Sequence, residues 1–222
     1  MLTFLGYTLV FLALLVSLYL VIRPAASSQP FLRTVAMGTQ SSPFLLLSLS
    51  FLLEATSLDL VSSYVGEGLP LLYRISAVWG SRSGPLLMWA SMMSVIAWLM
   101  SRDRTTDGAT IRIMHLWTFL LLLISAGLRP FSPAIPGSAG EISPLLQTDL
   151  MVIHPPVVFV YYSLCLATAS VAVSGLIRSR PSNEIHASMI PWARYSFLAG
   201  TIGIGLGGLW AYTVLDLSLI HI

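Results

Sequence analysis

The chain contains no lysine, and charged residues make up only 9 % of its 222 residues. Soluble globular domains carry about 25 % charged residues, so this scarcity excludes an ordinary soluble domain. The net charge of +2 leaves no basic face dense enough to follow a phosphate backbone, which excludes a nucleic-acid partner. The only cysteine, Cys165, lies in an apolar run and cannot form an internal disulfide, and we interpret it as a small buried hydrophobic residue. The few polar residues also offer no nucleophile–base pair and no Ser-His-Asp or binuclear metal arrangement.

Long apolar runs dominate what remains. Apolar residues make up 56 % of the chain, and the mean hydropathy is +0.84. A run of about 20 apolar residues crosses the ~30 Å hydrocarbon core of a bilayer as a helix. We therefore expect an all-α, polytopic membrane helical bundle with about six transmembrane helices in a lipid bilayer. The predicted spans are Leu2–Ile22, Pro43–Val61, Gly84–Met100, Ile111–Leu128, Leu150–Ile177 and Pro191–Val214.

The first span is expected to stay in the protein. No basic residue precedes it and Arg23 follows it, which is the wrong polarity for a cleaved signal peptide. The segment 62–83, between the second and third spans, is too polar to span and suits an interfacial position.

Arginines predict the orientation. The connectors after the second and fourth spans hold only Arg74, Arg82 and Arg129. The other connectors, or the span ends beside them, hold Arg23, Arg33, Arg102, Arg104, Arg112, Arg178, Arg180 and Arg194. The positive-inside rule places this second set in the cytoplasm or matrix, and the N-terminus and His154 on the outer side. His115 and His186 then lie on the inner side, where we expect solvated or interfacial side chains rather than ligands.

Glu54 is the acid that the predicted spans place deepest, about two turns from the end of the second span, while Asp59 is expected at the interface. A lone carboxylate in lipid is costly, so we expect Glu54 to face the bundle and to be paired or protonated. The sixth span is rich in glycine, which allows close approach of a neighbouring helix or a flat ligand. These features also suit an alternative function, a small-solute or ion transporter or a structural membrane subunit. No clear inverted repeat supports the transporter alternative.

His154 precedes Pro155 and Pro156 at the start of the long fifth apolar run. Prolines cost least in the first helical turn, so we expect His154 just outside that turn or within it, near the membrane surface. A neutral imidazole there can ligate a metal such as heme iron. It can equally cap the helix and do nothing more, and the spacing alone does not decide between the two.

Three segments, in order, resemble the cytochrome c maturation protein F family, the membrane heme lyase subunit. The matching stretches are Leu69–Gly80 with Gly84 and Leu86–Trp89, then Leu145–Asp149 with Ile153–Pro156 and Tyr161, and finally Gly203–Gly208 with Trp210–Tyr212. One turn departs from the family pattern: Gly80–Pro85 lacks the usual histidine and glutamate, and Arg82 stands there instead. Arg82 could meet a heme propionate or simply be solvated.

The resemblance implies heme b as cofactor, with His154 as one axial iron ligand and further ligands downstream of residue 216. The aromatic side chains of Trp79, Trp210 and Tyr212 would then form a flat apolar wall, although such residues are also common membrane-interface anchors. The implied partners are a membrane-anchored heme chaperone, a thiol-handling maturation partner and apocytochrome c with its Cys-x-x-Cys-His motif. Heme lyase activity would belong to the full-length protein and its complex, in the prokaryotic plasma membrane or the mitochondrial inner membrane.

Residues 217–222 are expected to be a non-native tail, because Leu217–Ile222 is what one frame of a common sequencing adapter encodes. We therefore expect residues 1–216 to be the N-terminal transmembrane part of a longer protein, and we do not count His221 as a ligand.

Overall fold

The computed structural model describes residues 1–23, 29–66, 68–103, 105–137 and 139–217. Within those ranges the chain is all-helical, with no strand beyond one isolated antiparallel bridge between Leu58 and Pro133. Six of its helices are long and apolar enough to cross a membrane, which confirms the expected class. These six are α1 (Leu2–Ile22), α2 (Pro30–Leu52), α5 (Gly84–Arg102), α6 (Gly108–Gly127), α7 (Asp149–Ile177) and α8 (Ser182–Leu215).

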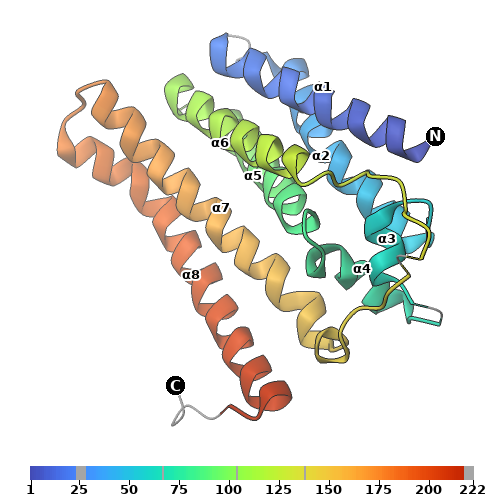
Figure 1. Ribbon diagram of the computed structural model, residues 1–222. Coiled ribbons are helices and arrows are strands. Elements are labelled where there is room, and N and C mark those ends of the chain that lie inside the picture. The colour runs from blue at the N-terminus through green and yellow to red at the C-terminus, as the bar shows by residue number, and fades with distance from the viewer. Residues whose placement is uncertain (24–28, 67, 104, 138, 218–222) are drawn as a thin grey trace.

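Helices α1, α2, α5 and α6 pack on one another, and α7 joins them along α5 and α6. Helix α8 packs mainly on α7, so this pair forms a hairpin at the side of the bundle (Figure 1). Only a small part of α8 is buried, and large apolar side chains such as Phe197 and Ile204 remain exposed on it. This exposure is what a lipid-facing helix shows.

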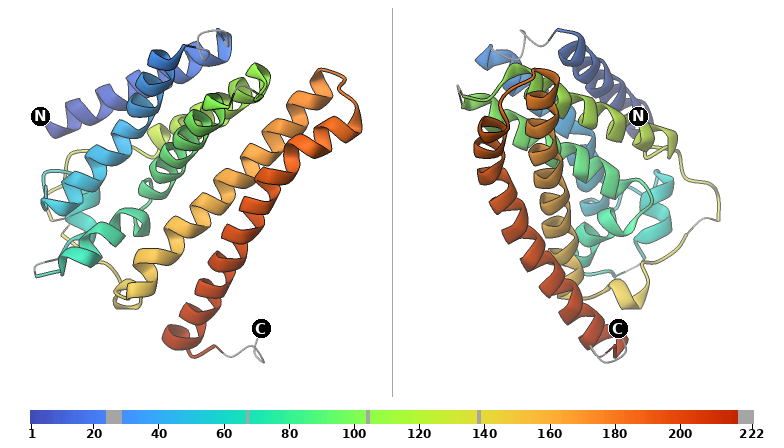
Figure 2. Two further views of the ribbon diagram at one scale, coloured as in Figure 1. Left: turned by 180° about the vertical axis from the view of Figure 1, so that it is seen from behind. Right: turned by 90° about the vertical axis from the view of Figure 1, so that its left-hand side faces the viewer.

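One end of the bundle carries the short helices. Helices α3 (Asp59–Tyr64) and α4 (Leu71–Gly80) lie there beside the long connector between α6 and α7 and the start of α7 (Figure 2). The connector is held by backbone hydrogen bonds, among them Asp59 N–H to Ser132 O at 2.9 Å and Ile142 N–H to Tyr64 O at 3.1 Å. Its Phe131 and Ile142 side chains are buried, so this polar loop is anchored by apolar residues.

The second span was predicted at the wrong place. The prediction began it at Pro43, but α2 begins at Pro30 and contains Pro43 in its interior. Pro43 removes the N–H that would bind the carbonyl of Thr39, and the Ser42 hydroxyl donates to that carbonyl instead at 2.8 Å. The local repair lets the helix continue through the proline.

The shift of α2 also moves Glu54 out of the membrane-spanning helix. Glu54 follows α2 in a turn with a φ of 50°, and it forms an ion pair with Arg74 of α4. The expected pairing is confirmed, while the expected depth is wrong. Asp59 likewise pairs with Arg82, so neither acid that suggested a transport pathway lies inside a long helix.

Candidate functional site

Helix α7 begins with a capped first turn. Thr148 is the N-cap residue, and its hydroxyl accepts a hydrogen bond from Met151 N–H at 3.3 Å. Asp149 places its negative charge in the first turn, where the helix dipole favours it. Because the helix starts at Asp149, His154 lies in the second turn and both following prolines are inside the helix. The prediction placed His154 about one turn too early.

The imidazole of His154 packs against α8 where α8 has no side chain. A Cβ atom built on Gly207 would lie 2.8 Å from His154 Cε1 and 3.3 Å from Nε2. The ring is half-buried, and its Nδ1 is buried without a hydrogen-bond partner among the described residues. A buried ring nitrogen with no protein partner is an uncompensated cost, and it leaves the imidazole uncommitted.

Two other glycines of α8 also lie in close contact with α7. Gly200 lies against the ring of Tyr161, and Gly203 lies against Val158 of α7, with distances of 2.8 Å and 3.3 Å from their built Cβ positions. Gly200, Gly203 and Gly207 are spaced by three and four residues, so they share one face of the helix. The predicted close approach is therefore to a neighbouring helix, α7, and it brings the α8 backbone to His154.

Trp79 lies at the end of α4 and reaches the first turn of α7. Its indole N–H donates to the carbonyl oxygen of Met151 at 2.7 Å. Tyr73, on the same short helix, donates from its hydroxyl to Asp149 Oδ1 at 3.4 Å. Helix α4 therefore braces the turn just before His154.

The other predicted heme contacts, Trp210, Tyr212 and Arg82, form no hydrogen bond to α7 within the described part of the chain. Trp210 is three residues beyond Gly207, half-buried, and its indole nitrogen is buried without a partner among the described residues. Tyr212 is 63 % exposed, and Arg82 reaches Asp59 at 3.1 Å with a largely exposed side chain. The structure thus brings Trp79 to the turn before His154 and Trp210 to the turn after Gly207. Contact of these residues with heme stays a prediction.

The other histidines do not join this site. His186 is exposed at the start of α8, as expected. His115 is not solvated, which corrects the prediction: it is 6 % exposed, and its Nδ1 lies 3.1 Å from the Gln40 amide nitrogen. No cluster of three or more His, Cys, Asp or Glu side chains that could hold a metal ion occurs in the part of the chain that the structure describes. His221 and residues 218–222 of the predicted tail lie outside the described residues.

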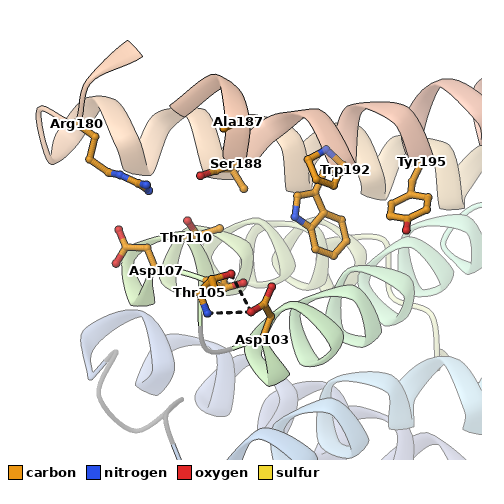
Figure 3. Close-up of a pocket in the computed structure, with 12 residues that line it drawn as sticks. Asp103, Thr105, Asp107, Thr110, Arg180, Ala187, Ser188, Trp192 and Tyr195 are labelled. Carbon is orange, nitrogen blue, oxygen red and sulfur yellow. Dashed lines mark hydrogen bonds between the residues drawn. The ribbon is translucent and has the colours of Figure 1, made fainter. Parts of the chain in front are cut away.

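A polar pocket of about 530 Å³ lies at the opposite end of the bundle, between the α5–α6 turn and α8 (Figure 3). Asp103 and Asp107 line it. Thr105 hydrogen-bonds Asp103 through its backbone N–H and its hydroxyl, which lowers the pKa of that carboxyl group below its usual value. Asp107 caps α6 and pairs with Arg178 at 2.9 Å. None of the predicted heme contacts lines this pocket, so we place the candidate site at the α4–α7–α8 end.

Comparison with known proteins identifies the family. Residues 79–218 match the family model described as cytochrome C assembly protein. The chain belongs to this family. The match begins at Trp79 and contains His154, Gly207 and Trp210, so the candidate site lies within the family region.

The matching relatives are cytochrome c-type biogenesis proteins. NrfE of Haemophilus influenzae is 30 % identical over 177 residues, which cover 75 % of this chain and 28 % of the relative. CcmF of Escherichia coli K12 is 29 % identical over 199 residues, 86 % of this chain and 31 % of the relative. CycK of Bradyrhizobium diazoefficiens is 28 % identical over 153 residues, 64 % of this chain and 23 % of the relative. The chain spans less than a third of each of these relatives. No solved structure gives a significant match.

The expected resemblance to CcmF-type biogenesis proteins is confirmed. Two features of the site were missed from the sequence, although signals for both were present. The contact between Gly207 and His154 follows from the glycine spacing once α7 and α8 are known to be neighbours. The bond from Trp79 to Met151 satisfies a carbonyl that Pro155 leaves free, because a helical proline always frees the carbonyl four residues earlier.

Proposed function

We propose that this chain serves cytochrome c biogenesis by presenting His154 to heme at the outer face of the membrane. The observation that carries the proposal is the uncommitted imidazole of His154, held between the second turn of α7 and Gly207 of α8. An axial ligand needs a ring nitrogen that is not committed to a protein partner, and Nδ1 of His154 has none among the described residues. The helix-cap alternative fits less well, since Thr148 already caps α7.

We further propose that the α3–α4 end faces the periplasm or its equivalent, in a prokaryotic inner membrane or a mitochondrial inner membrane. The described arginines support this orientation. Arg74, Arg82 and Arg129 lie at the α3–α4 end, and the first two are paired with acids. The other described arginines lie toward the opposite end: Arg23 follows α1, Arg33 and Arg112 lie in the first two turns of α2 and α6, Arg102 ends α5, Arg178 and Arg180 follow α7, and Arg194 lies in the first half of α8. The positive-inside rule places this richer set in the cytoplasm or matrix.

In this account the chain contributes binding and orientation rather than a nucleophile. Bound heme supplies the iron and the vinyl groups, and the cysteine thiols of apocytochrome c attach to those vinyl groups. His154 would hold the heme b iron from one side, while Trp79, Trp210, Tyr212 and Arg82 are proposed contacts of the porphyrin and its propionates. Holding the reactants in place is a sufficient role for the protein, because correct orientation alone lowers a bimolecular barrier by several kcal/mol.

The whole protein's reaction is also a proposal. We propose that heme arrives from a membrane-anchored heme chaperone, that a thiol-handling partner keeps the cysteines of apocytochrome c reduced, and that ligation requires the complete heme lyase complex. The second axial ligand would come from sequence beyond residue 216. We therefore expect residues 1–216 alone to bind heme weakly.

The test compares His154→Ala with His186→Ala in the complete protein that contains this chain. We expect His154→Ala to lower the heme content of the purified protein and to abolish cytochrome c maturation while the protein still inserts in the membrane. His186→Ala is the matched control, because it removes an exposed histidine at the opposite end of the α7–α8 pair. Unchanged heme content and maturation in His154→Ala would refute the proposal, and His154 would then be only a structural residue of α7.

A further inference from the structure

The first turns of α7 contain a backbone carbonyl that the helix cannot satisfy. In an α-helix the carbonyl of residue 151 accepts a hydrogen bond from the N–H of residue 155, and Pro155 has no N–H. The indole N–H of Trp79 fills the vacancy at 2.7 Å. The N–H of Met151 donates to the backbone carbonyl of Thr148 at 3.0 Å and to its hydroxyl at 3.3 Å, so both backbone polar groups of Met151 have partners.

The proline of α2 provides a comparison within the same molecule. Pro43 frees the carbonyl of Thr39, and the neighbouring Ser42 hydroxyl satisfies it within the helix. At Met151 the donor comes instead from α4, 72 positions earlier in the sequence. A carbonyl freed by a proline can therefore be satisfied by a neighbouring side chain of the same helix, as in α2. In α7 the donor comes from another helix, so the bond also links α4 to the turn that precedes His154.

We propose that Trp79 is a positioning residue for His154. Its indole N–H holds the Met151 carbonyl and thereby fixes the turn that presents the imidazole against Gly207. The positioning role rests on the proposed function of His154 as a heme ligand. It differs from a role as an apolar wall for the porphyrin, because positioning requires the N–H group and a wall requires only the face of the ring.

Two substitutions and their combination separate these roles. Trp79→Phe keeps an aromatic ring and removes the donor, which leaves a half-buried carbonyl unsatisfied. Pro155→Ala restores the N–H of residue 155, so Met151 O regains its partner within the helix. If the hydrogen bond is what matters, Pro155→Ala makes the indole N–H dispensable and rescues Trp79→Phe. A missing aromatic wall would not be rescued in this way.

Trp89 offers a matched control. It lies on α5 and packs on α7 with ring centroids 5.9 Å from Phe159 and 5.6 Å from Tyr162. Its indole nitrogen has no hydrogen-bond partner among the described residues. Trp89→Phe therefore removes similar packing against α7 without removing a bond, and Pro155→Ala should not compensate for it.

The first measurement uses the 222-residue chain without heme, in nanodiscs, by hydrogen–deuterium exchange of the amides of residues 152–154. We expect Trp79→Phe to speed this exchange about fivefold to tenfold, the factor of one buried hydrogen bond. In the Pro155→Ala background the same change should speed exchange less than about twofold. Trp89→Phe should leave these amides unchanged. Should Trp79→Phe unfold the chain, β-(3-benzothienyl)alanine at position 79 keeps the bicyclic shape and removes only the N–H.

The second measurement uses the complete protein and its heme absorption spectrum. We expect Trp79→Phe to lower heme content and to alter the spectrum of the remaining heme, and Trp79→Phe/Pro155→Ala to restore both. The proposal is overturned if exchange does not respond to Trp79→Phe, or if Pro155→Ala fails to rescue it. If exchange responds as expected but His154→Ala leaves heme content unchanged, the bond to Met151 is real, and the positioning role falls together with the proposed function.

Discussion

A methyl group at position 207 should displace His154 while leaving α8 intact. The Cβ of an alanine there would lie 2.8 Å from His154 Cε1, whereas ordinary van der Waals contact begins at 3.4 Å. The ring must therefore move by at least about 0.6 Å. It is a side chain of α7, so it can move more easily than either helix backbone.

Although Gly207→Ala displaces His154, it should raise the stability of the protein. Glycine in a helix interior costs about 1 kcal/mol relative to alanine, so alanine favours α8 at either position 207 or position 208. A Cβ on Gly208 meets nothing within 4 Å. Gly208→Ala should therefore raise the stability of the chain by up to about 1 kcal/mol without touching His154. Gly207→Ala should raise it less, since the displacement of the ring offsets part of the gain.

The assay is heme affinity of the complete protein, measured by absorption titration, together with thermal unfolding in detergent. A loss of about 1.4 kcal/mol in the interaction of the displaced ring with iron corresponds to tenfold in affinity, so we expect Gly207→Ala to weaken binding roughly tenfold. Gly208→Ala should bind as the wild type does. Equal affinity of the two variants would refute the reasoning, because it would mean that the position of His154 against α8 does not matter for heme.

Three further predictions concern the bundle. In a background without the native cysteine, a cysteine in place of Ala139 should be labelled from the periplasmic side and one in place of Asn183 from the cytoplasmic side; reversed accessibility would refute the orientation. Arg74→Ala should destabilise the protein by about 1–2 kcal/mol in thermal unfolding, because Arg74 pairs with Glu54 and also donates to a backbone carbonyl. Glu54→Ala, which removes only the exposed pair, should cost less than about 1 kcal/mol, and equal costs would contradict this assignment. Gln40→Ala should cost about 1–3 kcal/mol, since it leaves the buried His115 Nδ1 without a partner and removes a bond to Ser17, whose hydroxyl still donates to Ala13; an unchanged melting temperature would show that His115 finds another partner.

The membrane class and the existence of six long apolar helices were predictable from apolar runs, but α2 and α8 begin at Pro30 and Ser182, well before the predicted starts at Pro43 and Pro191. Lipid demands that each spanning segment satisfy its own backbone, so length and composition suffice to find such helices. The second span failed at Pro43, because a proline at a helix start and a proline inside a repaired helix look alike in sequence. In α2 the Ser42 hydroxyl donates to the Thr39 carbonyl that Pro43 leaves free, and this bond is visible only in the folded helix.

The sequence names the residues of the candidate site one by one, and their role stays a prediction; it does not give their arrangement. His154 was found from its proline neighbours, yet its depth depended on where Thr148 begins the helix. His115 was misjudged because its neighbour Gln40 lies 75 positions earlier in the sequence. The glycine spacing of α8 signals a close contact, but only the pairing of α7 with α8 identifies His154 as the residue that meets Gly207. Residue type and spacing reveal a candidate ligand, while partners far away in the sequence decide its environment.

The central claim, that His154 is an axial heme ligand, is tested most directly by exchanging the ligand. In His154→Cys the complete protein would offer the iron a thiolate in place of an imidazole, and a change of axial ligand changes the heme absorption spectrum. We predict a purified variant with reduced heme content whose remaining heme shows a thiolate-type spectrum. A spectrum and heme content identical to those of the wild-type protein would contradict the account.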